Sequence, residues 1–147
     1  MSNQQAMPLT QRLHRSFMDL NEVQRKHYQY IKARYNVSGI EMEIIQWIVL
    51  NGKKKMKEIS EHFNVKFSTL TNIVDKIEAQ KYVARKNSKE DRRVVYLEVS
   101  KKGQRLYENY TKHIQVMAQL MSQEMENDHF DILVEGLEKM AEFAGQP

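Results

Sequence analysis

The sequence contains no cysteine among its 147 residues, and only two prolines and five glycines. The absence of cysteine excludes disulfide bonds, thiolate metal sites and any sensing of oxidants through a thiol. No apolar run approaches the roughly 18–20 residues that cross a bilayer, and the N-terminal segment lacks the continuous apolar stretch of a secretion signal. We therefore expect a cytoplasmic protein without a membrane partner. The scarcity of proline and glycine favours a mainly helical chain with few loops.

Charge is distributed unevenly along the chain. The net charge is +4, but residues 52–105 carry 15 Lys and Arg against 7 Asp and Glu, a local excess of +8. The remainder of the chain therefore carries a net charge of −4. A concentrated basic field is typical of proteins that bind polyanions. From charge alone, a solvated basic face explains the pattern equally well. The order of the predicted helices and strands has to decide between the two interpretations.

Two long apolar stripes flank the basic centre. Apolar residues recur at three- and four-residue steps over residues 8–35, which predicts one amphipathic helix. A second stripe begins after Ser100, a plausible helix N-cap, and a last helix begins near His129. A central module of about 60 residues cannot bury these stripes alone. We favour a homodimer in which arms from two chains pack together, over arms that fold back within one chain.

The centre, residues 38–100, has the element order of a winged helix-turn-helix. Short helix, tight turn and longer helix form the first part, and a hairpin with a charged tip forms the wing. The expected elements are a capping box at Ser38–Glu41 opening a helix to Leu50, a basic linker Lys53–Lys55, helices 56–63 and 67–80, and strands 83–86 and 94–99 around a tip at 87–92.

The second helix of a helix-turn-helix lies in the major groove of DNA, with its N-terminal residues at the base edges. Small hydroxyl side chains and an asparagine at this end suit hydrogen bonds to bases and phosphates. The sequence therefore predicts a set of DNA contacts on this helix. The candidates are Lys66, Phe67, Ser68, Thr69, Thr71, Asn72 and Lys76.

The hairpin tip supplies the other predicted contacts. Arginine suits the strongly negative field of a narrow minor groove. Adjacent residues of a strand point to opposite faces, so Arg92 and Arg93 cannot both enter the groove. We predict that Arg92 contacts DNA and that Arg93 mainly forms an ion pair with Asp91 that stiffens the wing. Lys89 and the lysines of the basic linker are expected to attract phosphates without reading sequence.

These residues resemble the MarR family of winged helix-turn-helix transcription regulators. The resemblance is carried by Asp91-Arg92-Arg93, by Val99-Ser100-Lys101-Lys102-Gly103, and by the helix from Ser68 to Glu78. It implies one MarR-type domain over residues 1–147, with dimerisation helices at 8–35 and 101–147 around the DNA-binding lobe at 38–100. It also implies a homodimer that binds pseudo-palindromic double-stranded DNA, usually as a repressor, and that is released by a small aromatic or phenolic ligand.

Some positions depart from the family pattern. Lys66 stands where a serine often caps the recognition helix, Asn72 replaces a frequent arginine, and Lys81 replaces a glycine that commonly follows the helix. The first two leave the source of sequence specificity open. The family's ligand cleft makes Trp47 and Arg15 pocket candidates, although Trp47 is more readily explained as a core residue.

Other functions receive little support from the sequence. No glycine-rich phosphate loop and no nucleophile motif is present, so we expect neither catalytic residues nor a cofactor. No two histidines share a helix at zinc-binding spacing, so no metal site is expected. Two alternatives to the regulator stay open. They are an architectural protein that binds DNA without sequence preference, and a protein-interaction module that retains the fold without DNA binding.

Overall fold

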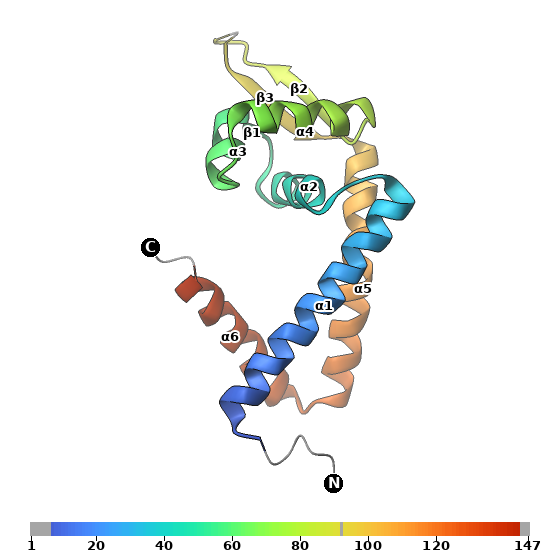
Figure 1. The fold of residues 1–147 in the computed structure, drawn as a ribbon, viewed down its shortest axis with the longest axis vertical. Coiled ribbons are helices and arrows are strands. Elements are labelled where there is room, and N and C mark those ends of the chain that lie inside the picture. Colours follow the sequence, from blue (N-terminus) through green and yellow to red (C-terminus); the bar gives the residue numbers. More distant parts are fainter. Residues whose placement is uncertain (1–6, 92, 145–147) are drawn as a thin grey trace. The chain divides into compact units, whose positions relative to one another are not determined.

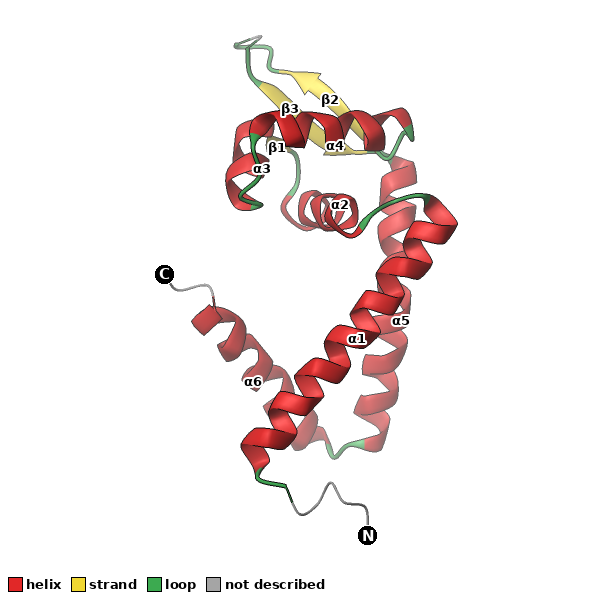
Figure 2. Ribbon diagram, in the orientation of Figure 1, coloured by secondary structure: helices red, strands yellow, loops and turns green. Residues whose placement is uncertain are grey.

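The computed structural model describes residues 7–91 and 93–144. The protein is mainly helical with one small antiparallel sheet (Figures 1 and 2). Its contacts divide the chain into two compact units, residues 1–107 and 108–147. None of the described helices is long and apolar enough to cross a membrane. The elements are α1 (Leu9–Tyr35), α2 (Gly39–Asn51), β1 (Lys54–Lys55), α3 (Met56–His62), α4 (Phe67–Ala79), β2 (Val83–Asn87), β3 (Val95–Val99), α5 (Lys101–Glu124) and α6 (Asn127–Ala144).

Helix α1 matches the helix predicted over residues 8–35. Pro8 precedes its first residue, where the missing N–H of proline costs nothing. The helix ends at Tyr35, and the residue that caps it, Asn36, has a left-handed backbone (φ 55°) and donates its N–H to the carbonyl of Lys32. Asparagine tolerates this conformation better than most residues. Ile31 and Val37 are buried beside this ending, so the C-terminal end of α1 is packed into the first unit.

Helix α2 begins at the predicted capping box. The backbone N–H of Ser38 donates to the Glu41 carboxylate at 2.8 Å, which satisfies one donor that a helix start leaves free. Ile44, Ile45 and Ile48 of α2 are buried, and each such side chain stabilises the fold by roughly 1.5–3 kcal/mol. They form the core of the lobe with apolar residues from the later elements. These are Met56, Ile59, Leu70, Val74, Ile77, Val83 and Leu97.

A tight turn joins α3 to α4. Asn64 takes a left-handed conformation (φ 48°), and the Val65 N–H returns to the carbonyl of Ser60 at 3.0 Å. The Ser60 hydroxyl donates to the Val65 carbonyl at 2.7 Å, so the two ends of the turn are joined by two hydrogen bonds. The predicted helix-turn-helix is therefore present, with the second helix ending at Ala79, one residue earlier than expected.

The sheet has the strand order β1-β3-β2 and is antiparallel throughout. In the hairpin Val83 faces Val99 and Asn87 faces Val95. The prediction that Lys53–Lys55 is only a linker was wrong, because Lys54 and Lys55 pair with β3 as a third strand. Two residues are too few to show the alternation of apolar and polar side chains by which a strand is recognised in a sequence.

The start of α5 is fixed against the end of the hairpin. The Ser100 hydroxyl accepts the N–H groups of Lys102 and Gly103, each at 3.1 Å, as the predicted N-cap does. It also donates to the carbonyl of Lys81 at 2.6 Å. A Cβ on Gly103 would stand 2.1 Å from the carbonyl oxygen of Tyr82, so only glycine fits at this close approach.

Lys81 occupies a backbone conformation that favours glycine, with φ at 64°. Its N–H donates to the carbonyl of Glu78, and the N–H of Tyr82 donates to that of Ile77. Paired bonds of this kind close the C-terminal end of a helix and commonly place glycine at the left-handed residue. The helix ending is therefore intact although lysine replaces the common glycine here. The left-handed backbone is less favourable for Lys81 than it would be for glycine.

The second unit holds the rest of α5 and helix α6, which begins two residues before the predicted start. Many large apolar side chains on these helices are exposed to solvent. They are Ile114, Val116, Met117, Leu120, Met121, Ile132, Val134, Leu137, Met140 and Phe143. Exposed apolar area of this extent marks an interaction surface.

Candidate nucleic-acid interface

Helix α4 divides into an inward and an outward face. Leu70, Val74 and Ile77 are buried, so the opposite face of the helix is held outward by the core. The polar candidates on the outward side, Ser68, Thr69 and Asn72, are exposed, as are Lys66 and Phe67 at the start. No side chain caps the N-terminal end of α4, and its first turn has no acidic residue. The predicted contact residues are thus brought together on one accessible surface, with the exception of Thr71, which is half-buried.

The hydroxyl of Thr71 is engaged within its own helix. It donates to the carbonyl of Phe67 at 2.9 Å, which leaves only its lone pairs for an outside donor. The side chain of Phe67 is 55 % exposed at the first position of α4. A large apolar ring therefore stands beside hydroxyl side chains at the end of the helix that was predicted to meet base edges.

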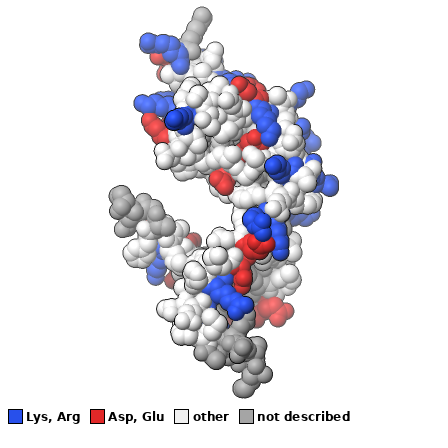
Figure 3. Space-filling view, viewed as in Figure 1, with Lys and Arg blue, Asp and Glu red and all other residues white. Residues whose placement is uncertain are grey.

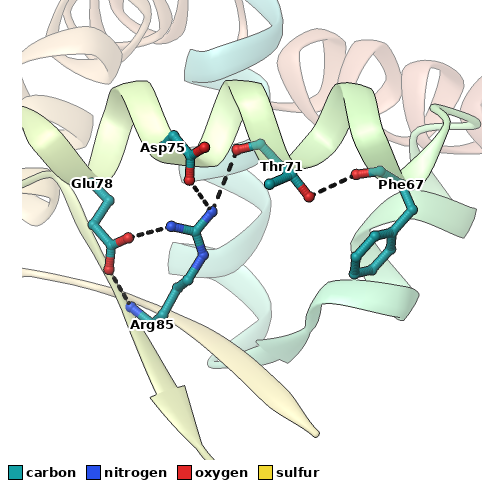
Figure 4. A network of polar contacts seen from close by, with 5 residues as sticks. All are labelled: Phe67, Thr71, Asp75, Glu78 and Arg85. Atoms are coloured by element: carbon teal, nitrogen blue, oxygen red, sulfur yellow. Dashed lines mark hydrogen bonds and ion pairs between the residues drawn. The ribbon is translucent and has the colours of Figure 1, made fainter. Parts of the chain in front are cut away.

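Arg85 of β2 ties α4 to the wing (Figure 4). Its backbone N–H donates to Glu78 at 2.9 Å, and its guanidinium forms a short bond to the same carboxylate. The guanidinium also donates to Asp75 at 2.6 Å and to the carbonyl of Thr71 at 3.4 Å. Arginine presents a planar fork of donors that suits such multiple bonding. The network fixes the hairpin against the flank of α4.

Lys76 of α4 forms an ion pair with Glu41 at the start of α2. Its ammonium lies 2.8 and 2.9 Å from the two carboxylate oxygens. The Glu41 side chain is 7 % exposed and the Lys76 side chain 42 %. Leaving a buried carboxylate without a partner is costly, so this bond holds the ammonium against Glu41. Two of the three ammonium donors of Lys76 are therefore engaged by Glu41.

The hairpin tip is organised around Ser88 and Asp91. The Ser88 hydroxyl accepts the N–H of Glu90 at 3.2 Å. The backbone N–H of Arg93 donates to Asp91 at 2.9 Å, and its guanidinium does so at 3.2 Å. Both bonds hold the pKa of Asp91 below its usual value. The Arg93 side chain is nevertheless 92 % exposed, so the ion pair contributes little to stability. Arg92 lies outside the described residues.

The basic strand β1 lies among aromatic rings. The Lys54 ammonium is 5.4 Å from the centre of the Trp47 ring, and His62 stacks on that ring at 4.3 Å. Phe63 meets the edge of Trp47 at 5.9 Å. Arg15 lines a shallow cavity of about 110 Å³ with other residues of the N-terminal segment, and Trp47 is not among them. The two pocket candidates thus have separate surroundings.

Sequence reasoning did not find Arg85 and Glu41 as bonding partners of α4. The acidic residues Asp75 and Glu78 are three positions apart and share a helix flank, which was the only local signal. The ion pair between Lys76 and Glu41 joins residues 35 apart in the chain, and no spacing rule connects them. On the face drawn in Figure 3, acidic side chains lie next to several of the basic ones.

Comparison with known proteins agrees with the winged helix-turn-helix described above. Residues 40–95 match the model of the MarR family. The chain is 22 % identical over 116 residues to the HTH-type transcriptional regulator MhqR of Bacillus subtilis, which covers 76 % of this chain and 77 % of that protein. Over residues 40–95 the chain is therefore similar to transcription regulators of the MarR family.

Two solved structures share the fold. Streptococcus pneumoniae FabT, crystallised in complex with DNA, superposes with a TM-score of 0.78 at 23 % identity, covering 92 % of this chain and 96 % of FabT. A MarR family protein from Bacillus stearothermophilus superposes with a TM-score of 0.77 at 20 % identity, covering 96 % and 100 % of the two chains. The winged helix-turn-helix expected from the sequence is thereby confirmed as the fold.

Proposed function

We propose that the protein is a homodimeric repressor that binds a pseudo-palindromic operator and is released by a small ligand. The observation that carries the DNA-binding part is the outward face of α4. Its exposed polar side chains are held by a buried apolar stripe, and Arg85 fixes the wing beside them. Lys66, Lys89 and Arg93 are exposed on the same lobe and supply positive charge for phosphates.

The homodimer is supported by the apolar surface of the long helices. Leu9, Leu13 and Leu20 of α1 are at least half exposed, and the second unit carries the larger set named above. A second copy of the chain would remove this surface from water, and closed two-fold dimers are the commonest oligomers. A two-fold axis would present two reading helices to half-sites that are about one helical turn apart, and hence to a palindrome.

The repressor role and the ligand rest on the family resemblance. Trp47 and Arg15 remain the candidates for ligand contact, with Trp47 offering a half-buried ring that His62 already stacks on. A ligand would release DNA by favouring a separation of the two reading heads that does not match the half-sites. Titration of simple phenolic acids against the DNA complex, followed by Trp47 fluorescence, tests this part separately.

The central experiment is footprinting on a duplex recovered from a random DNA pool. We expect protection of one discrete palindrome. Arg92→Ala should weaken binding and lower the slope of log affinity against log salt by about 0.9, since one phosphate or groove contact is lost. Arg12→Ala, which removes the same charge from an exposed position on α1, is the matched control. Unchanged affinity would remove Arg92 from the contacts.

An architectural DNA-binding protein is the second candidate, favoured by the many lysines of the central region. It predicts uniform protection along the duplex and no recovered consensus. Failure to bind any duplex at low salt would instead favour a protein-interaction module. Light scattering that shows a stable monomer at low micromolar concentration would overturn the homodimer.

A further inference from the structure

The side chains of α4 that are not bonded within the lobe indicate which base pair this helix would contact. Specific recognition of guanine is most often made by arginine or lysine, which donate to O6 and N7. Helix α4 contains one cation, Lys76, whose ammonium bonds both oxygens of the buried Glu41. The neighbouring cation of the wing, Arg85, is held by Glu78 and Asp75. Both of these cations are therefore bonded within the lobe, and the remaining cation beside α4, the exposed Lys66, precedes the helix as its N-cap and is assigned to phosphates.

The residues that remain free to face bases have a different chemistry. The exposed amide of Asn72 can accept from N6 and donate to N7 of adenine, the bidentate pairing that asparagine makes in the major groove. The ring of Phe67, 55 % exposed at the start of α4, offers apolar contact to the C5-methyl group of thymine. Adenine and thymine are partners in one base pair, so both contacts favour the same composition.

We propose that α4 reads A·T base pairs, with Asn72 contacting adenine and Phe67 contacting the thymine methyl group. This inference rests on the proposed function, since it assigns a base preference to the DNA-binding face. It explains why a large apolar ring is exposed among hydroxyl side chains, where solvation alone would favour a polar residue. It also assigns a role to the asparagine that stands in place of the arginine frequent in the MarR family.

The test uses the full-length protein and a duplex selected from a random pool. Each thymine of a half-site is replaced singly by uracil, which removes only the C5-methyl group, and each adenine by 7-deazaadenine, which removes only N7. We expect uracil to weaken wild-type binding by about threefold to fivefold at one or two positions, the effect of one buried methyl group. 7-Deazaadenine should weaken it by about fivefold or more where Asn72 pairs.

The variants Phe67→Ala and Asn72→Ala make the test specific to these side chains. Phe67→Ala should bind thymine and uracil duplexes equally, while Phe67→Leu, which keeps apolar bulk, should retain part of the preference. Asn72→Ala should lose the response to 7-deazaadenine only. Both positions are exposed, so thermal unfolding is expected to be unchanged and reports whether a variant has folded.

The outcomes separate the inference from the proposed function. A discrete site whose contacted positions are G·C pairs, especially one that depends on Lys66 at the helix start, would overturn the A·T assignment and leave the regulator intact. An equal loss on uracil substitution in Phe67→Ala and wild type would do the same for the thymine contact. Recovery of no consensus would overturn both the sequence-specific function and this inference.

Discussion

The ion pair between Lys76 and Glu41 leads to a prediction in which the effect of Lys76 on stability is measured separately from its effect on DNA binding. Lys76→Met leaves a carboxylate that is 7 % exposed and that still accepts the Ser38 N–H. Removing one partner of a buried pair costs about 3–5 kcal/mol. The lower end applies, about 3 kcal/mol, because Lys76 itself is 42 % exposed and water can approach the vacated place. For a chain of this length that corresponds to a fall in Tm of about 6–12 °C.

Glu41→Gln is the matched variant. Glutamine retains an oxygen that can accept the Ser38 N–H, and the freed ammonium of Lys76 can turn to solvent, so a loss of about 1–2 kcal/mol is expected. In the double variant no unpaired carboxylate remains, and its stability should be close to that of Glu41→Gln alone. The assay is urea unfolding of the four proteins followed by circular dichroism. Additivity of the two single effects within about 0.5 kcal/mol would refute the coupling.

The same variants show whether Lys76 contacts DNA. If the ammonium stays on Glu41 in the complex, Lys76→Met should change the salt slope of DNA binding by much less than the 0.9 or so expected for a phosphate contact. Glu41→Gln should make the slope steeper, because it frees a cation on the reading helix. A full loss of slope in Lys76→Met would restore Lys76 to the predicted contacts.

Three further predictions concern single positions. Gly103→Ala should destabilise the protein by about 2 kcal/mol or more in urea unfolding, because the new Cβ meets the Tyr82 carbonyl oxygen at 2.1 Å. Lys81→Gly should stabilise it by about 0.5–1 kcal/mol in the same assay, since glycine tolerates the left-handed backbone. Bonds from Arg93 lower the pKa of Asp91 in the folded protein. The stabilisation that these bonds give the wing is therefore fully present above the usual pKa of aspartate, about 3.9, and is lost as the pH falls through the lowered pKa of the folded state.

Each of these has a control. Gly39→Ala places its Cβ at an ordinary contact distance of 3.6 Å from the ring of Tyr28, so it should be tolerated where Gly103→Ala is not. Equal costs for the two would contradict the close approach at Gly103. A destabilised Lys81→Gly would show that the lysine side chain contributes more than its backbone costs. The wing prediction is followed through the Arg93 amide signal in NMR spectra, and Asp91→Asn should abolish its titration.

The sequence predicted those features that depend on neighbouring residues. The helices, the capping box at Ser38 and the N-cap at Ser100 follow from periodicity and from hydrogen bonds that span three residues, and the structure confirms them. The bonds of Lys76 and Arg85 join separate elements, so charge alone could not assign their partners. Strand β1 was not predicted because its two lysines show no strand pattern, and its pairing with β3 depends on the fold.

If the protein reads DNA sequence through the outward face of α4, as proposed, it should distinguish a selected palindrome from other DNA. The most direct measurement compares its affinity for the selected palindrome with that for a scrambled duplex of equal length and composition at physiological salt. The account predicts a preference of about a thousandfold or more for the palindrome, with most of it lost in Asn72→Ala. Equal affinity for the two duplexes would contradict the proposal.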